Sequence, residues 1–314
     1  MLLALWIFIF IISLTALIKA SDLFIDSAEK IGIAFHIPGF IIGVTIVSIG
    51  TSLPELLTSI IAMLKGETEV VIGNVVGSNI TNIFLGLGLL PLIIGFFVID
   101  KKLVSTDLPI LIGSTFLLTV TCLDGKFVPL EGLFCLAGFA IYMAYMLKEH
   151  REYKNTIEEH LRKPGRLDFK TIGILIISLI LIYLGAEFTI KSIIKISEIT
   201  KLSKDIVSAS ALALGTSLPE IITSVIAIRN GKKDIAVGTL FGSNIFNAFA
   251  IMGISGLLGT ITISTNMLIY GIGMLVLATL LYYFITLDQE ITEWEGGLLI
   301  IFYGVYIVKL FKLF

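Results

Sequence analysis

The stretch Gly-Thr-Ser-Leu-Pro-Glu decides the fold of this chain, and it occurs twice, at Gly50–Glu55 and at Gly215–Glu220. Each copy places a proline and a carboxylate inside a long apolar segment, where a membrane helix tolerates them least. Because Pro54 has no N–H and its ring crowds the carbonyl of Gly50, we expect the helix to loosen there and to free backbone oxygens. Free oxygens beside a glutamate are ligands for a hard cation. The repeated stretch therefore predicts a cation site.

The composition predicts an all-α membrane protein. The 314 residues are 56% hydrophobic and only 15% charged, the mean hydropathy is +1.02, and apolar segments repeatedly reach the roughly 20 residues that cross a bilayer. A net charge of −2 argues against a nucleic-acid partner. The chain has no His-Glu-x-x-His pattern for a zinc enzyme, and Cys122 and Cys135 are expected to be packing residues. We predict a protein that crosses the lipid bilayer several times, with no enzymatic activity and no cofactor.

The apolar segments predict ten membrane-spanning helices. The first is a long, tilted span that begins at Leu2 and continues toward Gly32. The others are expected at residues 38–64, 69–98, 104–122, 127–147, 171–197, 203–229, 234–258, 265–286 and 294–313. Residues 148–170 carry seven basic and five acidic residues and a Pro-Gly pair, so we expect a solvated loop between the fifth and sixth spans.

The distribution of Lys and Arg predicts how the chain lies in the cell membrane. Fourteen of these residues follow odd-numbered spans and eight fall on the opposite side, with seven of the fourteen in the loop 148–170. Because cytoplasmic loops carry the excess of positive charge, we expect this loop in the cytoplasm and both termini outside.

The two copies belong to a longer internal repeat. A shift of 165 residues superimposes Gly50–Glu55 on Gly215–Glu220 and Gly77–Ile80 on Gly242–Ile245 without a gap. The repeat predicts two five-helix halves, residues 1–147 and residues 171–314, joined by the loop 148–170. A repeat displaced by five crossings enters the membrane from the opposite face, so we expect the halves to be inverted with a site between them at mid-membrane. Glu55 and Glu220 would meet there.

Oxygen-bearing residues surround both glutamates at helical spacing. The first half carries Ser48, Ser52, Glu55 and Ser59 along one face, with Ser78 and Asn82 four residues apart in the next span; the second carries Ala213, Ser217, Glu220 and Ser224, with Ser243 and Asn247. The small-x-x-x-small pairs Gly73/Gly77 and Gly238/Gly242 are expected to let helices approach closely. A single serine in a membrane helix is more often structural, bonded to its own backbone. A carboxylate at mid-membrane costs about 2.5–3.5 kcal/mol, so two in symmetric positions indicate a function.

These motifs resemble the two alpha repeats of the sodium/calcium exchangers, within the cation/calcium exchanger superfamily, and especially its compact prokaryotic members. The resemblance implies calcium bound by the carboxylates of Glu55 and Glu220 and by the backbone carbonyls of Thr51 and Thr216. It implies sodium sites built from Ser52, Ser78, Ser217 and Ser243, the carbonyls of Ser48 and Ala213, and the glutamates, with Asn82 and Asn247 lining the centre. Several members carry Asp at the position of Asn82 or Asn247, whereas this chain has Asn at both.

The resemblance implies an antiporter that exchanges sodium for calcium by alternating access, with a monomer sufficient for transport. It also implies three sodium ions per calcium ion and hence electrogenic exchange. A proton/calcium exchanger is the nearer alternative, because two adjacent carboxylates repel each other and an empty site would take up protons. A cation channel or a sodium-coupled solute carrier is a more distant alternative. The polar residues near the glutamates are small and offer mainly oxygen, which suits ions better than an organic solute.

Overall fold

The structure is a computed structural model that describes residues 2–99, 108–158, 168–200 and 216–310, and almost all of these residues are helical. The first half contains α1 (Leu2–Phe35), α2 (Gly39–Ile42), η1 (Gly43–Val47), α3 (Ser48–Thr51), α4 (Leu53–Lys65), α5 (Thr68–Thr81), η2 (Asn82–Leu87), α6 (Gly88–Ile94), β1 (Phe96–Val98), α7 (Leu108–Cys122), β2 (Lys126–Phe127) and α8 (Pro129–Glu158). The second half contains α9 (Phe169–Thr200), α11 (Leu218–Arg229), α12 (Lys233–Phe246), η4 (Asn247–Ile251), α13 (Met252–Leu258), β3 (Ile261–Thr262), η5 (Met267–Ile272), α14 (Gly273–Ile285), β4 (Glu290–Thr292) and α15 (Glu293–Leu310). The η elements are π-helical turns.

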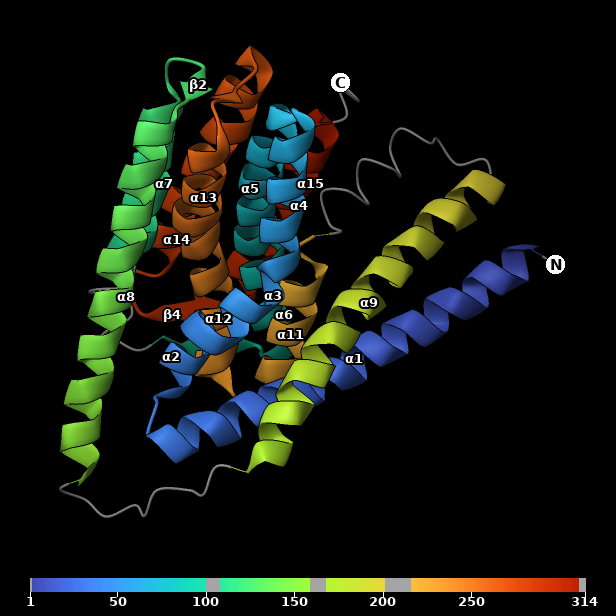
Figure 1. The fold of residues 1–314 in the computed structure, drawn as a ribbon. Helices are drawn as coiled ribbons and strands as arrows, with labels where there is room; N and C mark the ends of the chain where they lie inside the picture. The colour runs from blue at the N-terminus through green and yellow to red at the C-terminus, as the bar shows by residue number, and fades with distance from the viewer. Residues whose placement is uncertain (1, 100–107, 159–167, 201–215, 311–314) are drawn as a thin grey trace.

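Two long helices, α1 and α9, cross the central bundle diagonally (Figure 1). At 34 residues, α1 is about 50 Å long, which exceeds the roughly 30 Å of a bilayer core and therefore requires a tilt. The helices touch at Gly185, where an added Cβ would lie 2.9 Å from the Cβ of Leu17. Thr189 donates a hydrogen bond to the Ser13 hydroxyl next to this contact, at 3.0 Å. The small residue and the polar pair fix the crossing point of the two helices.

Two composite helices occupy the middle of the bundle. The α12–η4–α13 segment spans Lys233–Leu258, and all residues of its most apolar 18-residue stretch are buried. The α5–η2–α6 segment spans Thr68–Ile94, and 72% of the corresponding stretch is buried. Glycines allow the close packing around α12: an added Cβ would lie 2.6 Å from a backbone oxygen at Gly43 and at Gly238, and 2.5 Å at Gly242. The close approach that the small-residue spacing predicts is therefore found at Gly238 and Gly242. At Gly73 and Gly77 the nearest described atoms are 3.6 Å away or more.

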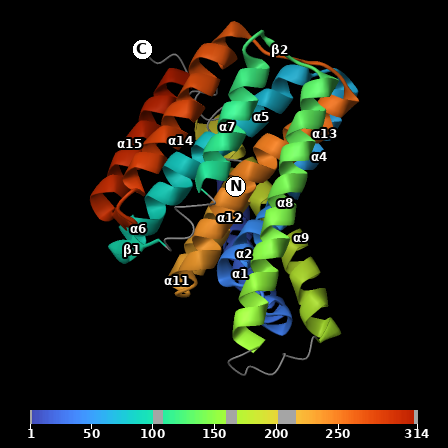
Figure 2. The ribbon, with the colours of Figure 1, turned by 90° about the vertical axis from the view of Figure 1, so that its left-hand side faces the viewer.

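The order of elements in the first half returns in the second. Helices α4 and α5 begin 165 residues before α11 and α12, and the π-helical turns η2 and η4 begin at Asn82 and Asn247, again 165 residues apart. The short strands follow the same shift: β1 pairs with β4 through Phe96↔Thr292, and β3 pairs with β2 through Ile261↔Phe127. Phe96 and Ile261 are 165 residues apart, and so are Phe127 and Thr292, so the two strand pairs are equivalent in the repeat. The two ladders lie at opposite ends of the bundle (Figures 1 and 2).

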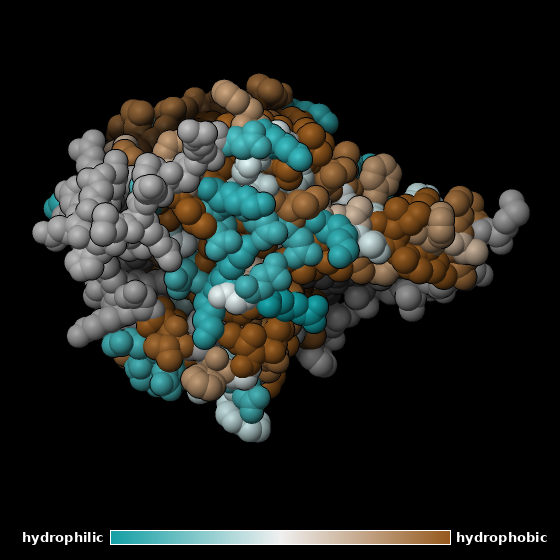
Figure 3. All heavy atoms as spheres, turned by 90° about the horizontal axis from the view of Figure 1, so that it is seen from below, coloured by the Kyte–Doolittle hydropathy of each residue, from teal (hydrophilic) through white to brown (hydrophobic). Residues whose placement is uncertain are grey.

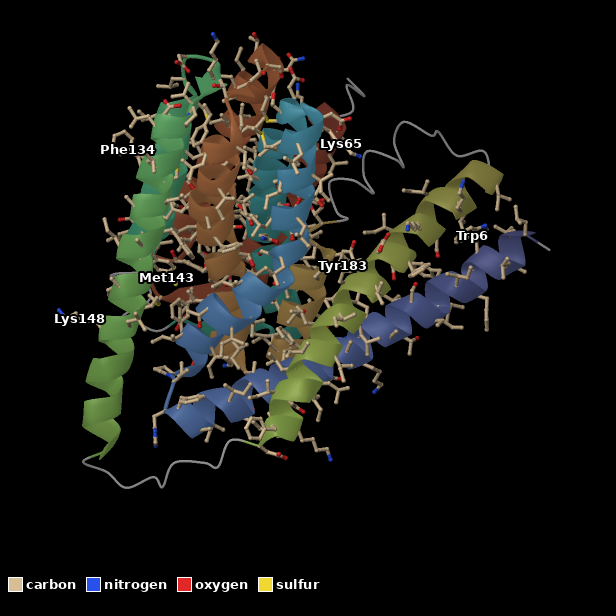
Figure 4. The ribbon with its side chains drawn as sticks, viewed as in Figure 1. Trp6, Lys65, Phe134, Met143, Lys148 and Tyr183 are labelled. Carbon is tan, nitrogen blue, oxygen red and sulfur yellow. The ribbon has the colours of Figure 1, made fainter. Side chains whose placement is uncertain are left out.

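Several boundaries differ from those expected. The predicted span 69–98 is helical only to Ile94, because Gly95 takes a left-handed φ of 85° and the β-prone residues after it form strand β1. The four short strands were not predicted at all, since each is too short to show an alternating pattern. The loop 148–170 is helical as far as Glu158, because its first residues are mostly Lys, Glu and Arg, which favour a helix. Along α8 the side chains change from apolar ones such as Phe134 and Met143 to the charged Lys148 (Figure 4).

The described residues include six helices long and apolar enough to cross a membrane, or seven if the bent pair Gly39–Thr51 and Leu53–Lys65 forms one span. Much of the predicted span 203–229 lies outside the described residues. Large apolar side chains are exposed on α1, α8 and α9, as lipid contact requires. The lower end of the molecule instead carries a broad hydrophilic patch, with apolar side chains above, below and to the right of it in Figure 3. The chain is a multi-pass membrane protein, and the full set of ten spans stays a prediction.

Candidate ion-binding site

The first repeated stretch breaks a helix at Ser52, and the serine of the second stretch, Ser217, has almost the same backbone conformation. Ser52 has φ −88° and ψ 4°, and Ser217 has φ −85° and ψ −3°. New helices begin at the following leucines, so each proline lies in a first turn, where its missing N–H costs nothing. The first break bends the chain by 42°. Backbone N–H groups at this break reach the carbonyls of Ser48 and Gly50. The Gly50 carbonyl is therefore not left free, contrary to the prediction, because a tightened last turn supplies another donor.

The two glutamates lie in the first turns of the helices that follow these serines. Glu55 lies in the first turn of α4 and Glu220 in the first turn of α11, and each residue is 1% exposed. Helix dipoles stabilise negative charge at these positions. The carboxylates lie close enough for their charges to interact. The structure thus brings together two acidic residues that are 165 positions apart in the sequence.

Many polar atoms around the glutamates are buried but have no hydrogen-bond partner among the described residues. Ser52 donates to Glu220 Oε1 at 2.9 Å, but Glu220 Oε2 and both carboxylate oxygens of Glu55 have no partner. The other unpartnered atoms of predicted site residues are Ser217 Oγ, Ser243 Oγ, Asn82 Oδ1 and Asn247 Oδ1. Ser224 Oγ, from the second repeated helix face, is also unpartnered. Buried oxygens without donors are costly, and a cation would satisfy them together.

The remaining predicted residues are placed as follows. Thr51 is buried beside the first break and interacts with Glu220, and Ser78 on α5 lies 3.0 Å from the Thr216 hydroxyl. The Ser48 hydroxyl bonds to the Val44 carbonyl, and the Ser48 carbonyl accepts the Ser52 N–H at 3.0 Å. Ala213 lies outside the described residues.

Three asparagines beside the site were not among the predicted ligands. Asn79 and Asn244 are 2% and 1% exposed and link α5 to α12 through side-chain hydrogen bonds. Asn74 donates to the Glu55 carbonyl and to the Ser59 hydroxyl, each at 3.1 Å. Asn79 and Asn244 occur at equivalent positions in the two repeats, and that repetition was the available signal. The position equivalent to Asn74 in the other half is Thr239, so the repeat gave no such signal there.

The site combines two carboxylates with neutral oxygens. Among the described residues, no group of three or more His, Cys, Asp or Glu side chains is arranged to hold a metal ion. Neutral hydroxyl, amide and carbonyl oxygens with one or two carboxylates suit the hard cations sodium and calcium, whereas zinc prefers nitrogen and sulfur. Calcium also accepts six to eight oxygens in flexible arrangements, at about 2.3–2.6 Å. The chemistry of the donor set therefore fits hard cations as cargo.

Comparison with known proteins agrees with this chemistry. The sequence profile of the sodium/calcium exchanger protein family matches residues 5–148 and 170–312. The chain is 31% identical to the sodium/calcium exchanger MaX1 of Methanosarcina acetivorans, with 96% of this chain and 97% of that protein aligned. It is 32% identical to an uncharacterised membrane protein of Methanocaldococcus jannaschii, over 97% and 96% of the two chains.

Solved structures show the same fold. The sodium-calcium exchanger NCX_Mj, soaked with zero Na⁺ and Ca²⁺, superimposes with a TM-score of 0.83 at 29% identity, covering 99% of this chain and 100% of that one. The same exchanger soaked with 2.5 mM Na⁺ and 10 mM Sr²⁺ gives a TM-score of 0.84. The structure soaked with sodium and strontium is described as showing extracellular ion exchange. With a family profile that covers both halves and relatives that span its whole length, this chain belongs to the sodium/calcium exchanger family.

Proposed function

We propose that this protein is an antiporter that exchanges sodium for calcium at the site between Glu55 and Glu220. The observation that carries the proposal is the cluster of buried oxygens without partners around two interacting carboxylates. Calcium would bind the two carboxylates and the carbonyls of Thr51 and Thr216. Sodium would use the hydroxyls of Ser52, Ser78, Ser217 and Ser243 as well, together with the carbonyls of Ser48 and Ala213 and the amide oxygens of Asn82 and Asn247.

Exchange follows from competition for the same oxygens. A site filled with sodium has no free carboxylate for calcium, and a site filled with calcium has none for sodium, so each ion leaves before the other binds. An empty site leaves two buried like charges together, which opposes crossing without a cargo ion. The two carboxylates carry a formal charge of −2, which one calcium ion neutralises. Three sodium ions would leave +1, so we propose electrogenic exchange.

We further propose that ten spans form two inverted five-helix halves, 1–147 and 171–314, with the site at mid-membrane. The strand pairs that the 165-residue shift converts into each other support a pseudo-twofold relation between the halves. In Figure 1 the end of α15 lies at the top of the bundle, the end of α8 and the start of α9 lie at the bottom, and α1 descends from its start at the right toward the bottom. This arrangement fits termini outside and the segment 148–170 in the cytoplasm. Access would alternate between the two faces, with a monomer sufficient.

Flux through purified protein in sealed vesicles tests the proposal. Vesicles loaded with sodium are expected to take up radioactive calcium, whereas vesicles loaded with potassium are not. Calcium uptake that needs no counter-gradient would indicate a channel instead. No potassium is expected to be required on either side, because Asn at 82 and 247 provides no third carboxylate for an additional monovalent ion.

Proton/calcium exchange is the second candidate, because the interacting carboxylates of Glu55 and Glu220 are groups that protons could also occupy. An acid vesicle interior without sodium separates the two candidates. Calcium uptake driven by the proton gradient alone would favour this second function, and uptake only with internal sodium would reject it.

A further inference from the structure

Four buried asparagines form a reciprocal set of hydrogen bonds between the α5–η2 segment, which carries two of them, and the α12–η4 segment, which carries the other two. The Asn79 side-chain amide donates to the Asn244 backbone carbonyl at 3.1 Å, and the Asn244 side-chain amide donates to the Asn79 backbone carbonyl at 3.4 Å. Asn247 donates to Asn79 Oδ1 at 3.0 Å, and Asn82 donates to Asn244 Oδ1 at 3.1 Å. All four residues are at most 2% exposed. We call this set the asparagine clasp.

The hydrogen-bond chemistry of the clasp allows one orientation of each amide. A backbone carbonyl only accepts, so Asn79 and Asn244 must turn their NH₂ groups toward each other's backbone and their side-chain oxygens away. Those oxygens in turn accept from Asn247 and Asn82, which must present NH₂ groups to them. The side-chain oxygens of Asn247 and Asn82 are therefore left on the opposite side of each amide. Both are buried and have no hydrogen-bond partner.

We infer that Asn79 and Asn244 are positioning residues whose hydrogen bonds make Asn247 and Asn82 present oxygen rather than NH₂ to the transported cation. The oxygen of a side-chain amide attracts a cation and its NH₂ group repels one. Without the asparagine clasp, either group could point toward the cation. Each positioning residue acts across the repeat boundary, because Asn79 of the first half orients Asn247 of the second, and Asn244 orients Asn82. The inference rests on one part of the proposed function, the binding of a cation at this site, and it does not depend on the direction of transport.

The decisive test replaces Asn247 or Asn82 with Asp. Both side-chain oxygens of Asp accept, so Asp presents oxygen to the cation whichever way it is turned. In the native background, Asn79→Leu keeps the side chain's approximate volume but removes the acceptor for Asn247. The sodium concentration that gives half of the maximal thermal stabilisation in detergent is expected to rise about tenfold, the size of one lost interaction with a charged partner. In the Asn247→Asp background the same substitution is expected to change this concentration by less than about twofold. There the Asn79 oxygen faces another acceptor, so removing that oxygen loses no hydrogen bond that orients residue 247.

A matched background shows that the effect is specific. Asn82 is held by Asn244, so in the Asn82→Asp background Asn79→Leu is expected to keep its full penalty of about tenfold. A role for Asn79 in packing alone predicts the same penalty in the native, Asn247→Asp and Asn82→Asp proteins, and that result would overturn the inference. If Asn79→Leu does not fold, Asn244→Leu in the native and Asn82→Asp backgrounds provides the reciprocal test, with the Asn247→Asp background as its control.

The binding measurement also separates this inference from the proposed function. A native protein that is stabilised by neither sodium nor calcium would reject the proposed function, and the inference with it. Native protein that binds and exchanges both ions, together with a penalty of Asn79→Leu that does not depend on the background, would reject only the asparagine clasp.

Discussion

At the scale of single residues, the two halves of the site are similar in composition but not in hydrogen bonding. Glu220 accepts a hydrogen bond from Ser52, whereas the equivalent serine, Ser217, has no partner and neither has the Glu55 carboxylate. Asn74 bonds to the Glu55 backbone, but Thr239 at the equivalent position bonds to Ile235 within its own helix. Equivalent residues therefore offer the same kinds of atoms to a cation, but some of these atoms are already hydrogen-bonded in the cation-free protein and others are not.

The first prediction concerns the charges of the site. Glu55→Gln and Glu220→Gln each keep the side-chain shape but remove one of the two negative charges that would face a divalent ion. We expect either substitution to abolish sodium-driven calcium uptake while the purified protein stays folded. Uptake of radioactive calcium by reconstituted vesicles is the measurement, and the monodispersity of the variant in detergent is the control. Sustained exchange by either variant would contradict the proposed site.

A second prediction uses the unequal serines. Ser52→Ala removes a hydrogen bond to a buried carboxylate and is expected to destabilise the cation-free protein by about 1–3 kcal/mol. Ser217→Ala removes a hydroxyl that has no partner, so we expect almost no loss of stability in cation-free buffer. Both variants should need more sodium for half-maximal stabilisation. Thermal unfolding with and without sodium gives both quantities, and equal losses in cation-free buffer would show that the Ser52 hydrogen bond contributes nothing.

At the scale of elements, the repeat places equivalent glycines in unequal surroundings. An added Cβ at Gly242 on α12 would lie 2.5 Å from the Ser48 hydroxyl and from the Val44 carbonyl, whereas at Gly77 on α5 the nearest described atom is 3.6 Å away. We expect Gly242→Ala to cost about 1–3 kcal/mol of stability by separating α12 from η1, and Gly77→Ala to cost little. The melting temperatures of the two variants in detergent test this difference. Similar melting temperatures would mean that α12 shifts freely.

The loop between α11 and α12 is tied to α1 by charge. The ammonium of Lys232 bonds to Asp26 and lies 3.0 Å from Glu29 Oε2, and Asn230 donates to Asp22 at 3.0 Å. Partial burial lowers the pKa of Lys232, but the hydrogen bonds and charges of the two carboxylates outweigh it, so this pKa lies above its usual value of 10.5. The pairs therefore stabilise the protein fully below pH 10.5, and their contribution is lost as the pH rises through the raised pKa.

The fourth prediction follows from this tie. Lys232→Met is expected to lower the stability by no more than about 1 kcal/mol, because Asp26 and Glu29 are partly exposed. The difference from the native protein should vanish at pH values above the raised pKa of Lys232. Lys233→Met, which changes an exposed neighbour, is the matched control. Melting curves across the pH range provide the test, and a difference that persists at the alkaline end would assign the effect to packing of the lysine stem.

At the scale of the whole molecule, we expect the transport cycle to move net charge. Three sodium ions leaving for each calcium ion entering carry one positive charge outward. An inside-positive potential should therefore speed calcium influx into sodium-loaded vesicles, and an inside-negative potential should slow it. Calcium influx under a potential clamped with potassium and an ionophore gives the answer. Influx that is indifferent to the potential would instead indicate two sodium ions per calcium ion.

The sequence by itself determined the class of the protein, the internal repeat and the residues of the candidate site. These follow from properties that a linear pattern carries: apolar length, the spacing of equivalent motifs, and the cost of an acidic residue and a proline in an apolar segment. The helix break beside Pro54 follows in the same way, since proline acts on its own turn.

Only the tertiary structure decided which of these residues have partners. The Gly50 carbonyl finds another N–H, Ser52 but not Ser217 bonds to a glutamate, and Asn79 and Asn244 orient the amides of the opposite half. A hydrogen bond requires that two atoms far apart in the chain lie at the right distance to within a few tenths of an ångström. Helical periodicity places a residue on one face of a helix but does not determine which residue lies opposite. The short strand pairs were invisible for the same reason, because two or three residues acquire a ladder only from the partner that the fold brings beside them.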